Sequence, residues 1–452
     1  MTARIPARAS LARLAADLAA GLVSSRELVE DCLGKAASPG GEGSRTYLKI
    51  AAEAARVAAD YFDKLRGLRA FPGPFAGIPV SVKDLFDVAG DVTTAGSMVL
   101  QDAPLATGDA VAVARLRAAG FIVLGRTNMT EFAFSGLGIN PHYGTPRNPW
   151  DRAAERIPGG SSSGAAISVT DGMAFGALGT DTGGSCRIPA AMCGIVGFKP
   201  TARRIPLAGT YPLSPTLDSI GTLSNSVSCC ALLDSVLAGE HPVKLVPASL
   251  AGLRLGVPRS YVFDGVTDKV AASFERALRV LSEAGADIQE LPFADLAELP
   301  EINSKAGFPA PEAYALHRER IALQRSGYDP RVLTRILRGR EQDAADYIDL
   351  HRRRQDFIHR VTPTVLAYDA MLMPTVPMVA PRLVELDSDE AYTRVNALAL
   401  RNSSIVNFID GCGISIPCHE PGEAPVGLTL FGSHQTDRRL LEIAAAVERC
   451  LV

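Results

Sequence analysis

Apolar residues at the start of the chain follow the spacing of an α-helix. Leucines recur every three or four residues from Leu11 to Leu22, which predicts a helix with one buried face. Ser24 and Glu27 then form an S-x-x-E capping box before a second apolar run, and this pattern indicates the start of a second helix. An alanine-rich stretch continues the helical pattern, so we expect helices throughout residues 1–70.

Beyond these helices, short apolar runs alternate with helical ones. The order is a strand over 77–84, a helix over 110–120 and a strand over 121–128, which is typical of a parallel or mixed α/β sheet. A similar unit recurs over 253–293, and a strand followed by a helix closes the chain. These patterns predict the α/β class, with one large mixed β-sheet surrounded by α-helices.

We expect the whole chain, residues 1–452, to form a single domain. The segment 71–239 contains the core of the sheet, and the segment 366–452 supplies closing strands and a helix. The segment 240–365 is Arg-rich and helical between about residues 310 and 360, which predicts a partly helical excursion packed on the sheet.

Composition and charge exclude several classes of function. The 452 residues carry a formal net charge of −3, and the positive charges are spread along the chain, so we expect no direct contact with nucleic acid. No apolar run approaches the ~20 residues that a membrane-spanning helix needs, and the N-terminus lacks the compact apolar run of a secretory signal. The eight cysteines include no CxxC pair, as is typical of buried cysteines in a reducing compartment. We therefore expect a soluble, cytoplasmic protein with no membrane partner.

The glycine- and serine-rich segment 158–200 is the strongest candidate for a catalytic site. It contains a helical pattern, a buried strand pattern and then the tight loop TDTGGS. A loop of this kind at the start of a helix directs consecutive main-chain N–H groups at one point. We therefore expect an oxyanion hole within the run from Thr182 to Ser185, with Thr182, Gly183 and Gly184 as its residues, beside the nucleophilic hydroxyl of Ser185.

A serine nucleophile needs a base, and lysine is one candidate. Lys83 is the only lysine between Lys64 and Lys199, and it follows the apolar strand pattern GIPVSV. Burial at this position would lower its pKa toward the range in which lysine accepts protons. The same residue could equally form an ion pair with Asp84 or Asp87 at the end of a strand, so its position alone leaves both interpretations open.

A different arrangement would place the nucleophile at Ser162. Residues 160–164 match the G-x-S-x-G elbow of α/β-hydrolases, for which His419 or His434 would serve as the base. That elbow needs a strand immediately before its serine, whereas residues 147–158 are polar and broken by prolines. The sequence therefore disfavours this arrangement.

Five motifs follow one another along the chain: GIPVSVKD, GRTNMTEFAFSG, NPHYGTPRNPWD, PGGSSSG and GTDTGGSCRIPAAMCGIVGFKPT. Together they resemble the amidase signature family, most closely over residues 75–222. The resemblance implies the amidase signature fold and a catalytic triad of Lys83, Ser161 and Ser185, in which Ser161 bridges the other two. It also implies a cis peptide bond between Gly160 and Ser161, and no metal, nucleotide or organic cofactor.

Amide hydrolysis is the function that this resemblance implies. We expect cleavage of a small carboxamide or related C–N amide bond through an acyl-enzyme on Ser185, with release of ammonia or an amine. The alternative is a glutaminase (A-type) subunit of a tRNA-dependent amidotransferase, although the sequence after the last motif differs from that of such subunits. The partner is then a small-molecule amide substrate, and a homodimer is a further expectation from the family.

Other residues allow less specific interpretations. Cys186 follows the nucleophile where the family often has an aliphatic residue, which implies a different pocket wall. Arg203 and Arg204 could bind a substrate carboxylate, or cap a helix or face solvent. Several aromatic and histidine side chains could line the acyl pocket or belong to the core: Phe132, Phe134, His142, Tyr143 and Tyr211.

Overall fold

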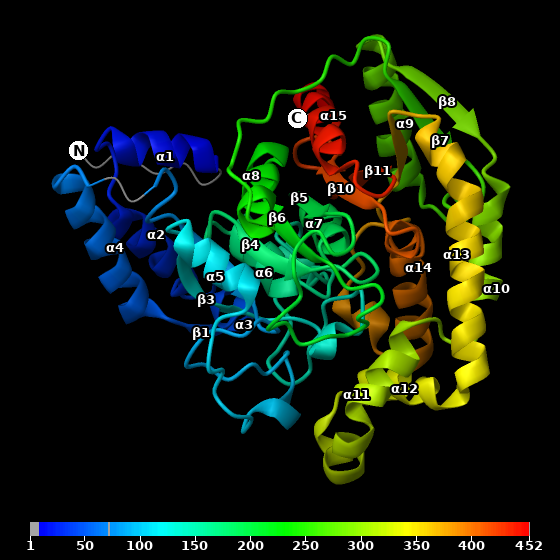
Figure 1. Cartoon of the computed structure of the whole chain (residues 1–452), viewed down its shortest axis with the longest axis horizontal. Coiled ribbons are helices and arrows are strands. Elements are labelled where there is room, and N and C mark those ends of the chain that lie inside the picture. Colours follow the sequence, from blue (N-terminus) through cyan, green and yellow to red (C-terminus); the bar gives the residue numbers. More distant parts are fainter. Residues whose placement is uncertain (1–8, 71–72, 452) are drawn as a thin grey trace.

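A single mixed β-sheet runs through the molecule. The computed structural model describes residues 9–70 and 73–451, and within them eleven strands lie in the order β1-β3-β2-β4-β6-β5-β10-β11-β9-β7-β8. The strands are β1 (Tyr47–Ile50), β2 (Pro79–Lys83), β3 (Ile122–Thr127), β4 (Ala177–Thr180), β5 (Val196–Lys199), β6 (Ile220–Ser224), β7 (Arg254–Pro258), β8 (Asp287–Leu291), β9 (Ala370–Pro374), β10 (Cys412–Pro417) and β11 (Gly427–Gly432). Figure 1 shows helices around this sheet, so the predicted fold class is confirmed.

Fifteen α-helices surround the sheet in the described residues. They are α1 (Leu11–Ala19), α2 (Ser25–Ala36), α3 (Gly43–Thr46), α4 (Ala52–Gly67), α5 (Val111–Ala118), α6 (Ser163–Thr170), α7 (Arg187–Cys193), α8 (Val227–Ala238), α9 (Asp268–Glu283), α10 (Leu299–Ile302), α11 (Pro309–Gln324), α12 (Pro330–Leu337), α13 (Ala344–Leu366), α14 (Asp389–Phe408) and α15 (Asp437–Leu451). No helix in this part of the chain is both long enough and apolar enough to span a bilayer.

The parallel part of the sheet lies where β3, β2 and β4 are neighbours. Strand β2 pairs in parallel with both β3 and β4, and β4 then pairs antiparallel with β6. Parallel neighbours have their carboxyl ends at the same edge of a sheet, which is where ligands bind in many α/β folds. Lys83 ends β2 and Thr180 ends β4, so this edge brings the lysine next to the loop that follows β4.

The two faces of the sheet are covered by different helices. Phe198 in β5 belongs to an apolar cluster with residues of α8, α9 and α15. The preceding residue, Gly197, points to the opposite face. A Cβ at Gly197 would lie 2.4 Å from the main-chain oxygen of Cys186 and 2.7 Å from the Cβ of Ala190. Helix α7 therefore lies directly on β5, on the face away from α8, α9 and α15.

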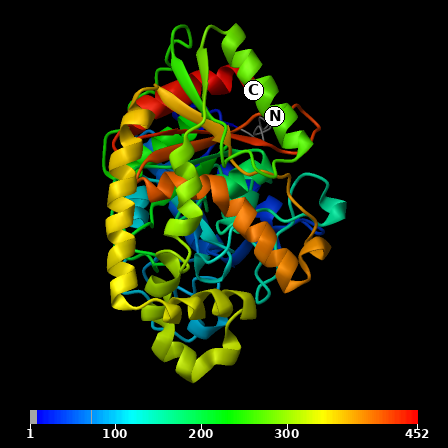
Figure 2. The same cartoon turned by 90° about the vertical axis from the view of Figure 1, so that its right-hand side faces the viewer.

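The helical excursion expected around residues 310–360 is present as α11, α12 and α13. These helices lie on the outside of one end of the molecule in both views (Figures 1 and 2). Strands β7 and β8, which precede them, extend the edge of the sheet by parallel pairing. The variable segment thus adds both strands and helices, while its proposed boundaries at 240 and 365 stay a prediction.

The N-terminal expectations need two corrections. Helix α1 ends at Ala19, where Gly21 with a φ of 69° reverses the chain, and Leu22 is 61% exposed. The capping box at Ser24 is present, but the segment expected to be wholly helical also contains the edge strand β1, which pairs with β3. Residues 1–8 lie outside the described residues.

We expect Gly197→Ala to destabilise the protein, because the added methyl group overlaps main-chain atoms next to α7. Overpacking of this kind costs about 1–3 kcal/mol. Gly34→Ala in α2 is the matched control, since nothing lies within 4 Å of its added Cβ and alanine is the better helix former. Thermal unfolding should give a lower midpoint for Gly197→Ala and an equal or higher one for Gly34→Ala. An unchanged midpoint for Gly197→Ala would contradict the close contact between β5 and α7.

Candidate active site

Lys83 is fully buried at the carboxyl end of β2. Its Nζ donates hydrogen bonds to the hydroxyls of Ser161, at 2.7 Å, and Thr180, at 2.9 Å. Burial lowers the pKa of Lys83 to about 8, although nearby acidic groups oppose the shift. Asp84 is paired with Arg126 instead, at 2.6 Å, and no carboxylate among the described residues pairs with Lys83. Its surroundings are those of an amine that can lose its proton near neutral pH.

Ser161 lies in the loop before α6, and the peptide bond that precedes it, Gly160–Ser161, is cis. The main-chain oxygen of Ser161 accepts a hydrogen bond from the N–H of Thr130 at 3.1 Å. Its buried hydroxyl accepts the hydrogen bond from Lys83 described above. The loop therefore holds this hydroxyl against the amine.

Ser185 lies in the loop between β4 and α7. Its main-chain oxygen accepts a hydrogen bond from the N–H of Ser162 at 3.3 Å, which joins this loop to the start of α6. Ser185 also lines a cavity of about 710 Å³. The structure therefore brings Ser185 next to the loop that carries Ser161 and opens it to a space for a ligand.

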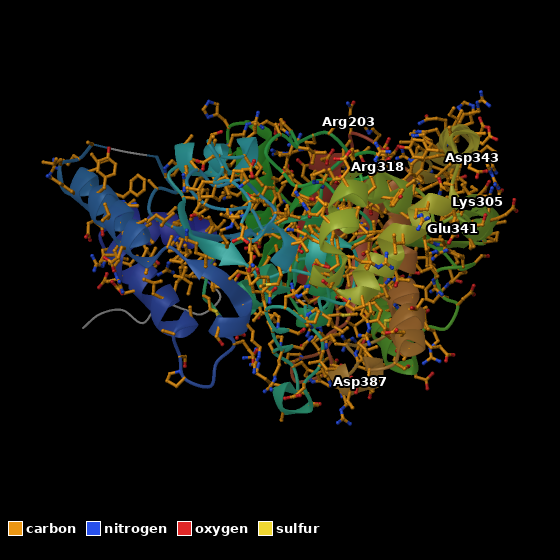
Figure 3. The ribbon with its side chains drawn as sticks, turned by 90° about the horizontal axis from the view of Figure 1, so that it is seen from below. Arg203, Lys305, Arg318, Glu341, Asp343 and Asp387 are labelled. Atoms are coloured by element: carbon orange, nitrogen blue, oxygen red, sulfur yellow. The ribbon has the colours of Figure 1, made fainter. Side chains whose placement is uncertain are left out.

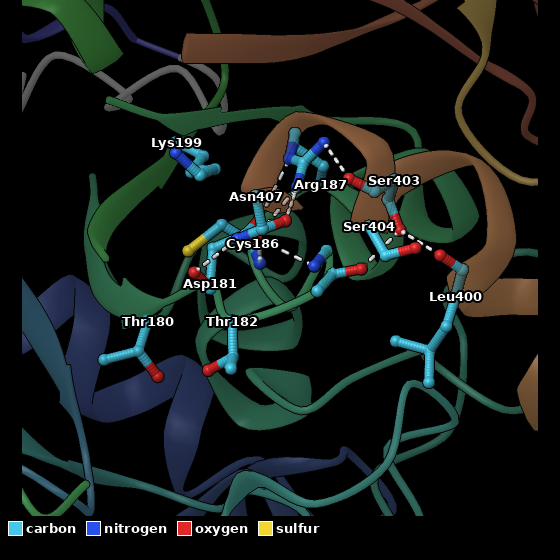
Figure 4. A network of polar contacts seen from close by, with 12 residues as sticks. Thr180, Asp181, Thr182, Cys186, Arg187, Lys199, Leu400, Ser403, Ser404 and Asn407 are labelled. Carbon is cyan, nitrogen blue, oxygen red and sulfur yellow. Dashed lines mark hydrogen bonds and ion pairs between the residues drawn. The ribbon is translucent and has the colours of Figure 1, made fainter. Parts of the chain in front are cut away.

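An ion pair between Asp181 and Arg187 closes the TDTGGS loop (Figure 4). Both side chains are fully buried, with guanidinium nitrogens 2.8 and 3.0 Å from the carboxylate oxygens. The N–H groups of Gly184 and Cys186 donate to the same carboxylate at 2.7 and 3.1 Å. Burial raises the pKa of Asp181, but the charge and hydrogen bonds of Arg187 outweigh burial and hold it at about 2. Asp181 is therefore an anion that fixes the shape of the loop.

Helix α14 supports the same loop from outside. Arg187 donates to the main-chain oxygen of Ser403 at 2.9 Å and to the side-chain oxygen of Asn407 at 2.7 Å. The Ser403 hydroxyl donates to the main-chain oxygen of Gly183 at 2.6 Å. Gly184 has a φ of +133°, and a Cβ there would lie 2.1 Å from the Ser403 hydroxyl oxygen. Only glycine fits this close contact between the loop and α14.

The main-chain N–H groups from Thr182 to Ser185 differ in whether they already have a hydrogen-bond acceptor within the protein. That of Gly184 is bonded to Asp181, so in this structure it is not available to a substrate oxygen. Those of Thr182, Gly183 and Ser185 have no acceptor among the described residues, and all three residues line the cavity. Within the expected oxyanion hole, the N–H groups of Thr182, Gly183 and Ser185 are therefore the candidate donors in this structure, and that of Gly184 is engaged by Asp181.

A second buried carboxylate, Asp218, lies beside this loop. It accepts a hydrogen bond from the Thr182 hydroxyl at 2.5 Å, and the N–H groups of Leu213 and Ser214 bond its other oxygen. Burial raises the pKa of Asp218 to about 6 in spite of these hydrogen bonds. Sequence reasoning missed Asp218, because nothing in the pattern around it signals that its side chain returns to Thr182.

The cavity extends from the TDTGGS loop toward the helical excursion. Besides the loop, its wall includes residues 133–135 and residues of the segment 299–309, α12 and α14. Most of these residues lie far along the chain from the five motifs. Ser185 therefore lines a space whose wall is formed largely by segments outside the five motifs.

Comparison with known proteins places this arrangement in a family. The family model described as Amidase matches residues 27–441. The chain is 38% identical over 402 residues to the 2-amino-5-chloromuconic acid deaminase of Comamonas testosteroni, and the match covers 87% of this chain and 86% of that protein. It is 33% identical to the A-type subunit of the glutamyl-tRNA(Gln) amidotransferase of Symbiobacterium thermophilum, over 97% of this chain and 96% of that protein. The chain belongs to the amidase family.

Solved structures agree with this assignment. A crystal structure of an amidase superimposes with a TM-score of 0.88 at 31% identity and covers 98% of this chain and 100% of that one. The peptide amidase of Stenotrophomonas maltophilia superimposes with a TM-score of 0.78 at 26% identity and covers 98% and 96% of the two chains. The amidase signature fold expected from the motifs is confirmed, and the chain is an amidase-family hydrolase of C–N bonds.

Ser162 of this amidase does not have the setting of a hydrolase elbow. In the described structure a loop, not a strand, directly precedes Ser162. The buried Ser162 hydroxyl donates to the main-chain oxygen of Thr180 at 3.4 Å. Both histidines considered as bases, His419 and His434, bond main-chain atoms of other segments. None of these three residues lines the cavity.

Most of the aromatic residues considered for the pocket lie elsewhere. Phe134 lines the cavity, whereas Phe132 and Tyr211 pack against His317, with ring centroids 4.3 and 5.8 Å from the imidazole. His142 bonds the buried carboxylate of Glu131 at 3.0 Å. Phe132 thus belongs to the core and Tyr211 packs against it, and neither these two residues nor His142 and Tyr143 line the cavity.

The two arginines considered for carboxylate binding also lie away from the cavity. Arg203 projects from the surface (Figure 3), where it pairs with Asp410 at 3.4 Å. Arg204 pairs with Asp234 and Glu240 at 3.0 and 2.7 Å. The cavity wall instead contains four arginines that sequence reasoning missed: Arg335, Arg338, Arg394 and Arg401.

The described residues contain no group of three or more His, Cys, Asp or Glu side chains that could hold a metal ion. Seven of the eight cysteines are buried as free thiols, and Cys450 is exposed. Cys186 is one of the buried ones, and burial raises the pKa of its thiol.

We expect Arg187→Met to destabilise the amidase strongly, because it leaves the Asp181 carboxylate buried without a cation. Breaking a buried ion pair in this way costs about 3–5 kcal/mol. The control is Arg353→Met, which removes an exposed pair with Glu301 at 2.8 Å and should cost less than about 1 kcal/mol. Urea unfolding of the two variants checks the difference, and equal midpoints would show that the Asp181–Arg187 pair is not what supports the loop.

Proposed function

We propose that this amidase hydrolyses a small carboxamide or a related C–N amide bond through an acyl-enzyme on Ser185. The observation that carries the proposal is the 2.7 Å hydrogen bond between the Lys83 amine and the Ser161 hydroxyl, beside a serine that faces a cavity. A buried amine with a pKa of about 8 is suited to accept a proton that a serine hydroxyl gives up.

The first half of the reaction forms the acyl-enzyme. The Ser185 oxygen attacks the amide carbonyl carbon, and its proton passes to the Ser161 oxygen while the Ser161 proton passes to neutral Lys83. This relay needs a contact between the hydroxyls of Ser161 and Ser185, which substrate binding would have to bring about. The C–N bond then breaks, and the leaving nitrogen takes a proton back through the same relay.

The second half of the reaction releases the acid. Water attacks the carbonyl carbon of the ester on Ser185 and gives a proton to the relay, and the ester C–O bond then breaks as the Ser185 oxygen takes that proton back. In both halves, the N–H groups of Thr182, Gly183 and Ser185 would stabilise the negative oxygen. Asp181 contributes by holding these groups in place, since its carboxylate bonds the intervening N–H of Gly184.

The second candidate function is the glutaminase subunit of a tRNA-dependent amidotransferase. Amidotransferase subunits of the A type from several bacteria are among the relatives, and that of Syntrophobacter fumaroxidans is 35% identical over 451 residues. This identity is close to that of the deaminase, so overall similarity does not separate the two functions. They differ in substrate, because only the second requires glutamine and a partner protein.

Substitution of the triad tests the proposal. We expect Ser185→Ala to lower ammonia release from a panel of primary amides and ureides by more than about 1,000-fold, and Lys83→Met by about 10²–10⁴-fold, because each removes an obligatory step. Ser162→Ala is the matched control and should stay within about tenfold of the wild type.

A fluorophosphonate probe should label Ser185 in the wild type. A label on Ser162, together with an active Ser185→Ala variant, would overturn the assignment of the nucleophile. Turnover of glutamine alone in the same panel would favour the amidotransferase function.

The pH dependence of hydrolysis should follow the protonation of the Lys83 amine. Only its neutral form accepts a proton, so kcat/KM for a neutral amide should rise with pH and level off above about 8, where Lys83 has lost its proton. Lys199 is the matched control, since burial lowers its pKa to about 8 as well, but among the described residues its amine bonds main-chain oxygens, those of Pro200 and Gly411, and no hydroxyl. Lys199→Met should keep the shape of the profile. A flat profile between pH 6 and 9 would contradict Lys83 as the base.

A further inference from the structure

In the described structure, all the Arg, Lys, Asp and Glu residues that line the cavity at Ser185 are positively charged arginines. Its wall carries four arginines, Arg335, Arg338, Arg394 and Arg401, and no Asp or Glu among the described residues. A cavity lined by one sign of charge attracts ligands of the opposite sign. Most of the remaining wall consists of leucine, alanine, proline and aromatic residues, so the arginines set its electrostatic character.

Arg335 on α12 is the partly buried one of three wall arginines that have no ion pair or side-chain hydrogen bond in the described structure, the other two being the exposed Arg338 and Arg394. Its guanidinium carbon lies 4.7 Å from the centre of the Phe134 ring, and its Nε is buried without a hydrogen-bond partner. One turn earlier on the same helix, Arg331 pairs with Asp389 at 2.9 Å. Arg401 donates to two main-chain oxygens and a side-chain oxygen. No carboxylate among the described residues pairs with Arg335, although a buried cation without a partner is costly.

A second unpaired donor lies on the same side of the cavity. The side-chain oxygen of Asn396 accepts hydrogen bonds from the Ser135 hydroxyl at 2.9 Å and from the N–H of Gly136 at 2.8 Å. These two bonds fix the orientation of the amide, and its Nδ2 is buried with no partner. Because Ser135 directly follows Phe134, the unpaired groups of Arg335 and Asn396 flank one short segment of the wall.

We infer that the substrate is an amide whose acyl part carries a carboxylate, which binds Arg335 beside Asn396 while the amide carbon lies at Ser185. A carboxylate supplies the negative charge and the acceptor oxygens that these donors lack, and a guanidinium binds it through paired N–H groups. Arg338 and Arg394 are exposed and also line the cavity, so they add to the attraction for an anion. This inference rests on the proposed amide hydrolysis, since Ser185 lines the same cavity as Arg335.

The test compares acids with neutral amides of the same length. The probes are ω-amido acids with two to five methylene groups between the amide and the carboxylate, and the matching amides in which a hydroxymethyl group replaces the carboxylate. We expect the wild type to prefer at least one acid over its neutral match by about 10- to 100-fold in kcat/KM, as one charge-assisted contact provides. Arg335→Met should remove most of this preference, and Arg335→Lys, which keeps the charge but not the planar fork, should retain part of it.

Arg318→Met provides the matched control. Arg318 is an exposed arginine of the neighbouring α11 (Figure 3) and does not line the cavity, so its loss changes the net charge equally and should leave the preference for the acid intact. Circular dichroism and thermal unfolding establish that each variant is folded. Equal rates for acids and neutral amides in the wild type, or the same preference in Arg335→Met, would overturn the inference and leave the proposed hydrolysis standing.

Failure of the proposed function would give a different result. If the wild type hydrolyses neither acids nor neutral amides, calorimetric titration of Ser185→Ala with the acids tests Arg335 alone. Binding that the additional Arg335→Met change weakens at least tenfold would support the carboxylate site. Binding that is absent, or unaffected by that change, would overturn it.

Discussion

The buried ion pair between Asp181 and Arg187 is the constraint on which the rest of the site depends. The carboxylate of Asp181 is bonded by the side chain of Arg187 and by the N–H groups on either side of Ser185. Arg187 in turn bonds α14. One pair of charges thus determines the path of the nucleophile loop, the start of α7 and the position of a helix more than 200 residues away along the chain. A buried pair of this kind contributes little net stability, but it is costly to break, which suits a loop that must keep one shape.

Burial has opposite consequences for Lys83 and for Arg335. Burial of Lys83 brings the pKa of its amine to about 8, so the group can exist as a neutral base near physiological pH. The guanidinium of Arg335 in the cavity wall cannot lose its proton in a protein, so burial of its Nε leaves it charged and in need of an anion. The difference in intrinsic basicity between lysine and arginine therefore separates proton transfer from the attraction of charge.

The parts that could be predicted from the sequence are those whose signal is local. Strand β2 with Lys83 at its end and the TDTGGS loop follow from apolar patterns and glycines within a few residues. The use of the Gly184 N–H could not be predicted, because it depends on where the Asp181 side chain turns. Arg335 and Asn396 carry no local signal either. They reach the cavity because α14 packs beside the TDTGGS loop and α12 beside Phe134, and such contacts between distant segments are set by tertiary structure.

The catalytic groups and the recognition groups at the cavity come from two separate parts of the sequence. The groups assigned to the chemistry lie between β2 and the start of α7, whereas Arg335 lies on a short helix of eight residues in the excursion at the edge of the molecule. Replacement of residues on that helix exchanges the recognition surface without moving the strand ends that hold the reactive groups. A scaffold built in this way can acquire new substrates during evolution by drift in one peripheral helix, while selection on the catalytic loop stays unchanged.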